Sequence, residues 1–204
     1  MTKPGFFKRL KALSLQQKKL FAVALCQRMQ PNYQLFAEVC QFGNATVLET
    51  LQQLLWQSLY DNKLKLNLEA QINKLEENTP EPEDFDVYGV YPALDAVVAL
   101  SSYLGALQSK IEDDITNISK LSSATVANYV EALIGDDFTN ESALDDAVYA
   151  HPMMQQEREL QASLLEIIEE NPEPSAEFIK ALRKEIVQDG VSNIGISLAD
   201  NAES

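Results

Sequence analysis

Three aspartates and two tyrosines gather in one short stretch near the middle of the chain. That stretch reads Asp84-Phe85-Asp86-Val87-Tyr88-Gly89-Val90-Tyr91-Pro92-Ala93-Leu94-Asp95-Ala96. Hard divalent cations prefer several carboxylate oxygens, and phenols beside them can bind or protonate a ligand. The candidate ligand-binding residues are therefore Asp84, Asp86, Tyr88, Gly89, Tyr91 and Asp95. The sequence predicts no cofactor, with a divalent cation at these carboxylates as an alternative.

A purely structural interpretation of the same stretch stays open. Aspartates are common in turns because they hydrogen-bond to their own backbone, and Asp95 suits the first turn of a helix, where a negative charge is stabilised. Tyrosines suit the boundary between core and water. Gly89 is expected either to adopt a positive φ or to allow another group to approach the backbone closely.

Two further acidic patterns resemble the magnesium sites of all-α enzymes. Glu112-Asp113-Asp114-Ile115-Thr116-Asn117 is similar to a motif of prenyl-diphosphate enzymes, but the second acidic motif of those enzymes is missing. Glu166-x-x-Glu169, followed by Glu185 and Asp189, is similar to a pyrophosphatase pattern, but its second pair is spaced by four. Acidic residues in a first helical turn are favoured electrostatically. Both patterns are therefore interpreted as charged helix surfaces.

Motifs for nucleophilic catalysis or phosphate binding are absent from the sequence. The chain has no phosphate-binding Gly-rich loop and no Gly-x-Ser-x-Gly. Its single histidine, His151, precedes a proline and has no Cys or Ser motif near it. The sequence therefore favours a non-catalytic protein over an enzyme.

Charge is distributed unevenly along the chain. Residues 1–78 carry ten Lys/Arg and six Asp/Glu, whereas residues 79–204 carry six and twenty-five, and the formal net charge is −15. Basic residues alone, from Lys3 to Arg28, precede the first acid, Glu38. We expect this basic start to lie against the acidic half, with contact to lipid or nucleic acid as the alternative. An acidic body favours a basic protein partner and opposes direct binding to nucleic acid or membrane.

The elements that position these residues are predicted to be helices. Apolar residues recur at helical spacing nearly throughout, with Ser14, Asn44, Asn67, Asn140 and Ser175 as N-caps. We predict a single all-α domain over residues 1–204, a bundle of about eight helices with a short extended tail at 191–198. A Pro-rich loop at 79–92 joins its mildly basic and strongly acidic halves.

Proline and glycine set the predicted helix boundaries. Pro31 is expected to end the first long helix, and Gly43, Gly135 and Gly190 to end later ones. Pro92 suits the first turn of a helix that is apolar over most of its circumference. We therefore expect that helix to lie at the centre of the bundle.

Cysteine usage and hydropathy predict a cytoplasmic protein. Cys26 and Cys40 fall on apolar helix faces, where a free cysteine behaves as a small hydrophobe, and two cysteines suit a reducing compartment. The most apolar segment, Tyr91 to Leu107, contains Asp95, so no membrane span is expected. The first residues lack the pattern of a secretory signal.

Three segments together resemble one known family. The Asp84–Ala96 stretch, Cys26-Gln27-Arg28-Met29-x-Pro31-Asn32-Tyr33, and Ser192-Asn193-Ile194-Gly195-Ile196 are similar to the YjaG-like proteins of gammaproteobacteria, a domain of unknown function. The resemblance spans nearly the whole chain and is weakest between about 110 and 150. It implies an all-α fold and a bacterial cytosolic setting, and brings no activity, cofactor or catalytic residue.

The function predicted from the sequence is non-catalytic. The leading hypothesis is an acidic helical interaction or regulatory protein of the bacterial cytoplasm that engages a basic protein. The alternatives are a divalent-metal-dependent hydrolase of a small phosphorylated molecule, and a small-ligand-binding protein that uses the Asp/Tyr stretch.

Overall fold

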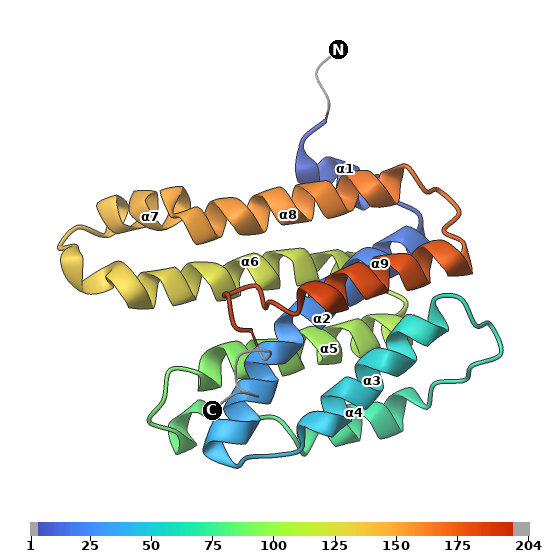
Figure 1. Ribbon diagram of the computed structural model, residues 1–204, viewed down its shortest axis with the longest axis horizontal. Helices are drawn as coiled ribbons and strands as arrows, with labels where there is room; N and C mark the ends of the chain where they lie inside the picture. The colour runs from blue at the N-terminus through green and yellow to red at the C-terminus, as the bar shows by residue number, and fades with distance from the viewer. Residues whose placement is uncertain (1–3, 198–204) are drawn as a thin grey trace.

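The computed structural model describes residues 4–197 and consists of packed helices (Figure 1). Within that range the α-helices are α1 Phe6–Ala12, α2 Leu15–Cys40, α3 Ala45–Ser58, α4 Leu68–Glu76, α5 Val90–Ser109, α6 Glu112–Ile134, α7 Glu141–Ala150, α8 Pro152–Glu169 and α9 Ala176–Asp189. Two 3₁₀ turns, η1 Pro82–Asp84 and η2 Gly135–Asp137, complete the list. The all-α prediction is confirmed, with nine helices there instead of about eight. Lys3 and Leu198 lie outside the described residues.

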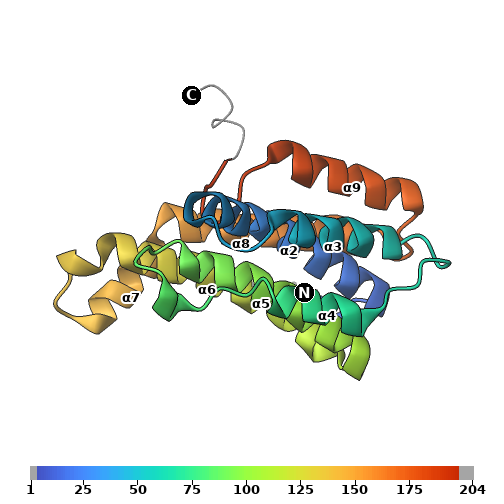
Figure 2. The same cartoon turned by 90° about the horizontal axis from the view of Figure 1, so that it is seen from below.

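Helix α2 is the hub of the fold. It contacts α3, α5, α6, α8 and α9, and its buried residues run from Gln17 to Ala37. Figure 2 shows α9 on one side of the layer that holds α2, α3 and α8, with α4, α5 and α6 on the other. The expectation that the Pro92 helix, α5, holds the centre is therefore wrong in part. Helix α5 packs against α2, α4 and α6, and α2 joins more elements.

Pro31 does not end a helix, contrary to prediction. A proline inside a helix removes one N–H donor and crowds the carbonyl four residues earlier, yet α2 continues through it to Cys40. Burial of Met29 and Tyr33 on either side holds both halves in the core. The turn before Pro31 also gains a bond from outside the helix, because the backbone N–H of Asn193 donates to the carbonyl of Arg28 at 3.3 Å.

The predicted N-caps are confirmed. The side chains of Ser14, Asn44, Asn67, Asn140 and Ser175 each accept a hydrogen bond from a backbone N–H in the first turn of their helix. Each bond satisfies one of the donors that a helix leaves unpaired at its start.

One helix of the described chain has the length and hydropathy needed to cross a membrane. This is α5, and 56% of its apolar window is buried inside the protein. The helix contributes Ala93, Val97, Leu100 and Leu104 to the main hydrophobic cluster, which draws residues from Leu10 to Leu182. It has the environment of a core helix.

Residues 191–197 form a turn instead of one extended segment. Val191 and Ser197 make an isolated antiparallel bridge, and the N–H of Ser192 donates to the carbonyl of Ile196 at 2.8 Å. Gly195 takes φ 84°, a conformation that favours glycine. Asn193 and Ile194 are buried against the bundle. We call this segment the 191–197 turn.

Candidate functional site

Three tyrosine rings meet where α5 begins and α6 passes beside it. The ring centroid of Tyr88 lies 5.5 Å from that of Tyr91 and 5.8 Å from that of Tyr129. Tyr88 is 37% exposed and Tyr91 51% exposed, so their rings are accessible to a partner. We call these three residues the tyrosine surface. The sequence predicted Tyr88 and Tyr91; it did not predict Tyr129, which reaches the cluster only because α6 packs on α5.

Asp95 supplies a carboxylate beside the tyrosine surface. It lies one helical turn after Tyr91 and accepts a hydrogen bond from the Thr125 hydroxyl at 2.7 Å. Burial raises the pKa of Asp95, and the Thr125 bond opposes that shift. Burial also raises the pKa of Tyr88, and the negative charge of Asp95 adds to this effect. Tyr88 is therefore a neutral phenol at pH 7 and can donate a hydrogen bond.

The remaining predicted site residues do not join this cluster. Asp84 and Asp86 are exposed, and across residues 4–197 no three His, Cys, Asp or Glu side chains are grouped to hold a metal ion. The expectation for Gly89 is wrong. Its φ is −54°, because it already belongs to the turn that starts α5, and an added Cβ would meet only Phe36, at 4.0 Å.

The chain segments that supply the tyrosine surface are strongly acidic. Residues 75–109 contain seven Asp or Glu and no Lys or Arg, and residues 121–157 contain the same numbers. One segment provides Tyr88, Tyr91 and Asp95, and the other provides Tyr129 and Glu131. The charge of Glu131 is close enough to contribute to the raised pKa of Tyr88. A cationic group is therefore attracted here.

A buried ion pair lies in the interior between α2 and α8. Arg28 Nη1 is 2.7 Å from Glu157 Oε2, and the Glu157 side chain is fully buried. The other carboxylate oxygen of Glu157 accepts from Ser122 Oγ and from Gln161 Nε2, both at 2.7 Å. The buried charge is thus compensated by one guanidinium and two neutral donors, as a stable buried carboxylate requires.

The 191–197 turn connects to this polar network. Asn193 Nδ2 donates to the backbone carbonyl and the hydroxyl of Ser122, both at 3.2 Å, and Asn193 Oδ1 accepts from Asn32 Nδ2 at 2.9 Å. Two of the segments that carry the family resemblance therefore meet in space. Sequence reasoning missed Glu157, although its position on the buried face of α8 with Gln161, Leu164 and Ile168 is a usable signal.

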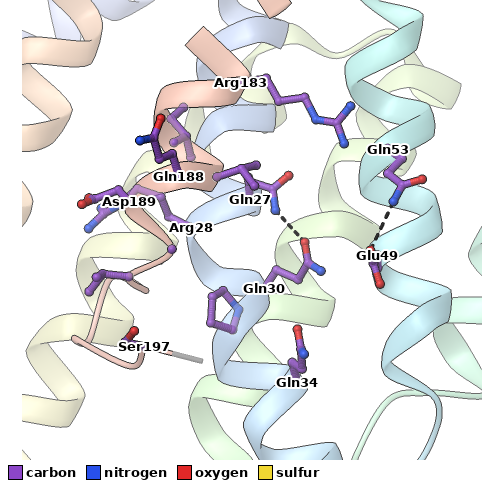
Figure 3. A pocket seen from close by; sticks show the side chains of 15 residues that line it. Gln27, Arg28, Gln30, Gln34, Glu49, Gln53, Arg183, Gln188, Asp189 and Ser197 are labelled. Atoms are coloured by element: carbon purple, nitrogen blue, oxygen red, sulfur yellow. Dashed lines mark hydrogen bonds between the residues drawn. The ribbon is translucent and has the colours of Figure 1, made fainter. Parts of the chain in front are cut away.

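A polar groove of about 400 Å³ opens where α2, α3 and α9 meet (Figure 3). It is lined by Gln27, Arg28, Gln30, Pro31, Gln34, Glu49, Gln53, Arg183, Ile186, Val187, Gln188, Asp189, Gly190, Val191 and Ser197. Its amides are partly bonded to one another, with Gln27 Nε2 2.7 Å from Gln30 Oε1. Two arginines and two acids line the groove, so it suits a neutral polar group and selects no charge.

The basic start of the chain lies against the acidic half, as expected. Arg9 Nε donates to Glu169 Oε1 at 2.9 Å, Lys18 Nζ lies 2.6 Å from Glu112, and Lys11 Nζ lies 3.5 Å from Asp113. The two magnesium-like acidic patterns are thus engaged in ion pairs between distant segments. Their interpretation as charged helix surfaces agrees with this geometry.

Comparisons with known proteins agree with the resemblance in the sequence. The profile of a family described as "Protein of unknown function (DUF416)" matches residues 5–197. The chain is similar to the uncharacterized protein YjaG of Escherichia coli K12, at 35% identity over 92% of this chain and 94% of that one. It is similar to an uncharacterized protein of Haemophilus influenzae, at 35% identity over 93% and 95% of the two chains.

A solved structure matches the fold over nearly its whole length. The crystal structure of a DUF416 family protein from Shewanella baltica OS155 is 67% identical, covers 96% of this chain and 100% of its own, and superposes with a TM-score of 0.91. These relatives carry no described activity. The chain belongs to the DUF416 family, the YjaG-like proteins of unknown function.

Proposed function

We propose that this protein is a non-catalytic interaction protein of the bacterial cytoplasm that binds a basic segment of a partner protein. The observation that carries the proposal is the tyrosine surface. Its three rings are held together next to the Asp95 carboxylate, between two chain segments that have acidic residues and no Lys or Arg.

The chemistry of this surface suits an arginine or lysine side chain. A cation over the face of a tyrosine gains about 0.5–1 kcal/mol at an exposed site and about 2 kcal/mol when water is excluded. The carboxylates of Asp95 and Glu131 add charge-assisted hydrogen bonds, for which the planar guanidinium of arginine is better shaped than an ammonium. The net charge of −15 raises the rate at which a basic partner associates.

The experiment is a peptide-binding titration followed by fluorescence anisotropy. Three labelled peptides of equal length carry arginine, lysine or glutamate at the same positions between glycines and serines. We expect the arginine peptide to bind more tightly than the lysine peptide, the glutamate peptide not to bind, and both affinities to fall as salt is added. Tighter binding of the arginine peptide than of the lysine peptide would show that the surface recognises the planar guanidinium, through the tyrosine rings and the carboxylates, and not positive charge alone.

Matched variants locate the binding site. Tyr88→Leu keeps an apolar side chain and removes the ring, and we expect it to weaken the arginine peptide about fivefold or more, the equivalent of one cation–π contact. Tyr60→Leu is the control, because the Tyr60 ring already has Lys180 over it, at 4.8 Å. Equal affinities for the wild type and both variants would show that the tyrosine surface is not the binding site.

A further inference from the structure

A second cavity, away from the tyrosine surface, lies between α1, α6, α8 and the end of α7. Its volume is about 520 Å³, which is within the range of roughly 300–1,000 Å³ typical of small-molecule pockets. It is lined by Phe6, Phe7, Ser119, Lys120, Ser123, Tyr149, Met154, Arg158, Gln161 and Ala162. We call it the α1–α8 pocket.

The walls of the α1–α8 pocket are mostly apolar and partly open to water. Phe6 and Phe7 meet edge to face, with ring centroids 5.1 Å apart. Phe7 is 46% exposed and Tyr149 66% exposed, so two large rings at this pocket stay in contact with solvent. Apolar surface of this kind gains free energy when a ligand covers it.

The charged residues that line this pocket are both cations, Lys120 and Arg158. Lys120 Nζ lies 5.8 Å from the centre of the Phe7 ring, and the Arg158 guanidinium lies 4.0 Å from the centre of the Tyr149 ring. In a protein of net charge −15, a lining with two cations and no acid is a local reversal of charge. The polar groove of Figure 3, in contrast, mixes two arginines with two acids.

One donor of Arg158 is buried and has no partner. Nη2 of Arg158 donates to the Tyr149 carbonyl at 2.9 Å, whereas Nη1 is shielded from water and, within residues 4–197, makes no hydrogen bond. A buried donor without an acceptor destabilises the protein. An acceptor on a ligand would remove that cost, and a charged acceptor would do so most strongly.

The floor of the pocket is polar and already satisfied. Gln161 is 3% exposed, and its Nε2 lies within 3.2 Å of the Ser119 carbonyl, the Ser123 hydroxyl and Glu157. The floor is therefore fixed by the network around the buried ion pair. Free hydrogen-bonding capacity lies with the two cations, Lys120 and Arg158.

We propose that the α1–α8 pocket binds an amphipathic monocarboxylate, a ligand with one carboxylate on a chain or ring of about ten carbon atoms. The carboxylate is attracted by the Arg158 guanidinium and by Lys120, while the apolar body covers Phe6, Phe7 and Met154. This site shares no residue with the tyrosine surface, so the proposal stands independently of the proposed function.

Calorimetric titration of the intact protein with decanoate, below the concentration at which it forms micelles, tests the proposal. We expect one molecule of decanoate to bind per chain, and 1-decanol and decyltrimethylammonium, which share its apolar body, to bind at least tenfold more weakly. Phenyl-substituted alkanoates distinguish a chain-shaped from a ring-shaped apolar body. Equal affinity for decanoate and 1-decanol would overturn the proposal, because the two cations would then contribute nothing.

Variants assign the binding to this pocket. Arg158→Gln removes a charge-assisted donor and is expected to weaken decanoate about tenfold or more. Ala162→Phe fills the cavity and is expected to abolish binding while leaving the charges in place. Lys184→Gln, an exposed lysine on α9, removes one positive charge elsewhere and is expected to bind decanoate as the wild type does.

Two controls keep the result interpretable. A thermal melt of each variant shows that it is folded, and folded Ala162→Phe protein with wild-type affinity would overturn the assignment even if Arg158→Gln fails to fold. Tyr88→Leu is expected to keep wild-type decanoate affinity, which separates this site from the tyrosine surface. Binding to phosphatidylglycerol vesicles without binding to dissolved decanoate would replace a soluble ligand with a membrane surface.

Discussion

At the residue scale, the glycine at position 43 is held in place by a buried tyrosine. Gly43 has φ 61°, and an added Cβ would lie 2.4 Å from Tyr33 Oη and 3.0 Å from Asn78 Oδ1. Tyr33 is fully buried, and burial raises its pKa to about 12. Asn78 Oδ1 in turn accepts from the backbone N–H of Asn44 at 2.7 Å. A side chain at position 43 therefore disturbs the start of α3.

Alanine substitutions at Gly43 and Gly89 should have different effects on the stability of the protein. Gly43→Ala imposes the left-handed penalty of about 1–2 kcal/mol and a steric clash, so it should lower the melting temperature by several degrees. Gly89→Ala meets neither problem, because φ is −54°, and should leave the temperature unchanged or raise it slightly. Urea unfolding of both variants measures the difference. Equal destabilisation would contradict this account of the two backbone conformations.

The candidate site could be predicted from sequence only where its residues are local. Tyr91 and Asp95 are spaced by four residues within α5, so helical geometry brings them to one face, and Tyr88 lies in the turn just before that helix. Tyr129 and the Arg28–Glu157 pair depend on how α6 and α8 pack, which no local pattern specifies. Asp84 and Asp86 share a stretch with the tyrosines but are exposed to solvent.

At the element scale, α2 depends on a turn that lies far from it in sequence. The 191–197 turn supplies the bond to the Arg28 carbonyl and the side-chain bonds that link Asn32 to Ser122. Ser192 stabilises the turn from within, since its hydroxyl accepts from the N–H groups of Ile194 and Ile196 at 3.2 and 3.0 Å. The turn thus links α2 to α6 close to Pro31, which lacks the N–H donor of a regular helical residue.

Asn193→Ala should destabilise the protein strongly, although Asn193 lies near the end of the chain. The change leaves the buried amide of Asn32 without its acceptor, at a cost of about 1–3 kcal/mol. It also removes the two bonds that Asn193 donates to Ser122. We expect a loss of at least about 2 kcal/mol in urea unfolding. Ser197→Ala, in the same turn but without those bonds, is the control. A loss no larger than that of the control would show that the turn only rests on the bundle.

Helix boundaries were predictable where a side chain acts on its own backbone. The five N-caps are of this kind, because the acceptor and the donor lie within three residues of each other. Pro31 was misinterpreted because its local cost is outweighed by burial of Met29 and Tyr33, which depends on the surrounding helices. Helix α1 was not predicted, because its N-cap, Gly5, makes no side-chain bond.

At the scale of the whole molecule, the halves of opposite charge are joined by ion pairs. Arg9, Lys11, Lys18 and Arg28 each meet a carboxylate of the acidic half. Apart from the buried Arg28–Glu157 pair, these pairs lie at the surface and contribute about 0–1 kcal/mol each. Their main effect is to fix how the two segments align. The acids around the tyrosine surface belong to the face on which we propose that a basic partner binds.

Asp95 should make the stability of the whole protein depend on pH. Its pKa in the folded state is raised above the ordinary value of 3.8, so the native state holds this proton more tightly than the unfolded chain does. The free energy of unfolding therefore falls as the pH rises from about 3.8, the ordinary pKa, through the raised pKa of Asp95 in the folded state. Asp95→Asn, which can still accept from Thr125, should raise the melting temperature at pH 7 and lose that advantage below about pH 3.8.

The control for this prediction is Asp86→Asn, an exposed carboxylate in the same stretch. If Asp86→Asn raises the melting temperature at pH 7 as much as Asp95→Asn does, the effect comes from net charge and not from the burial of Asp95. Asp95→Asn should also weaken the arginine peptide. One carboxylate then lowers stability and supports binding, a trade-off common at functional sites.

The buried ion pair also constrains how the nascent chain matures on the ribosome. Glu157 follows Arg28 by 129 residues, and at about 5–20 residues per second it is synthesised about 6–26 seconds later. Until then the Arg28 guanidinium has no buried counter-charge and must stay hydrated. Helix α2, which carries Arg28, therefore cannot complete its contacts with α8 and α9 until the last third of the chain has been synthesised.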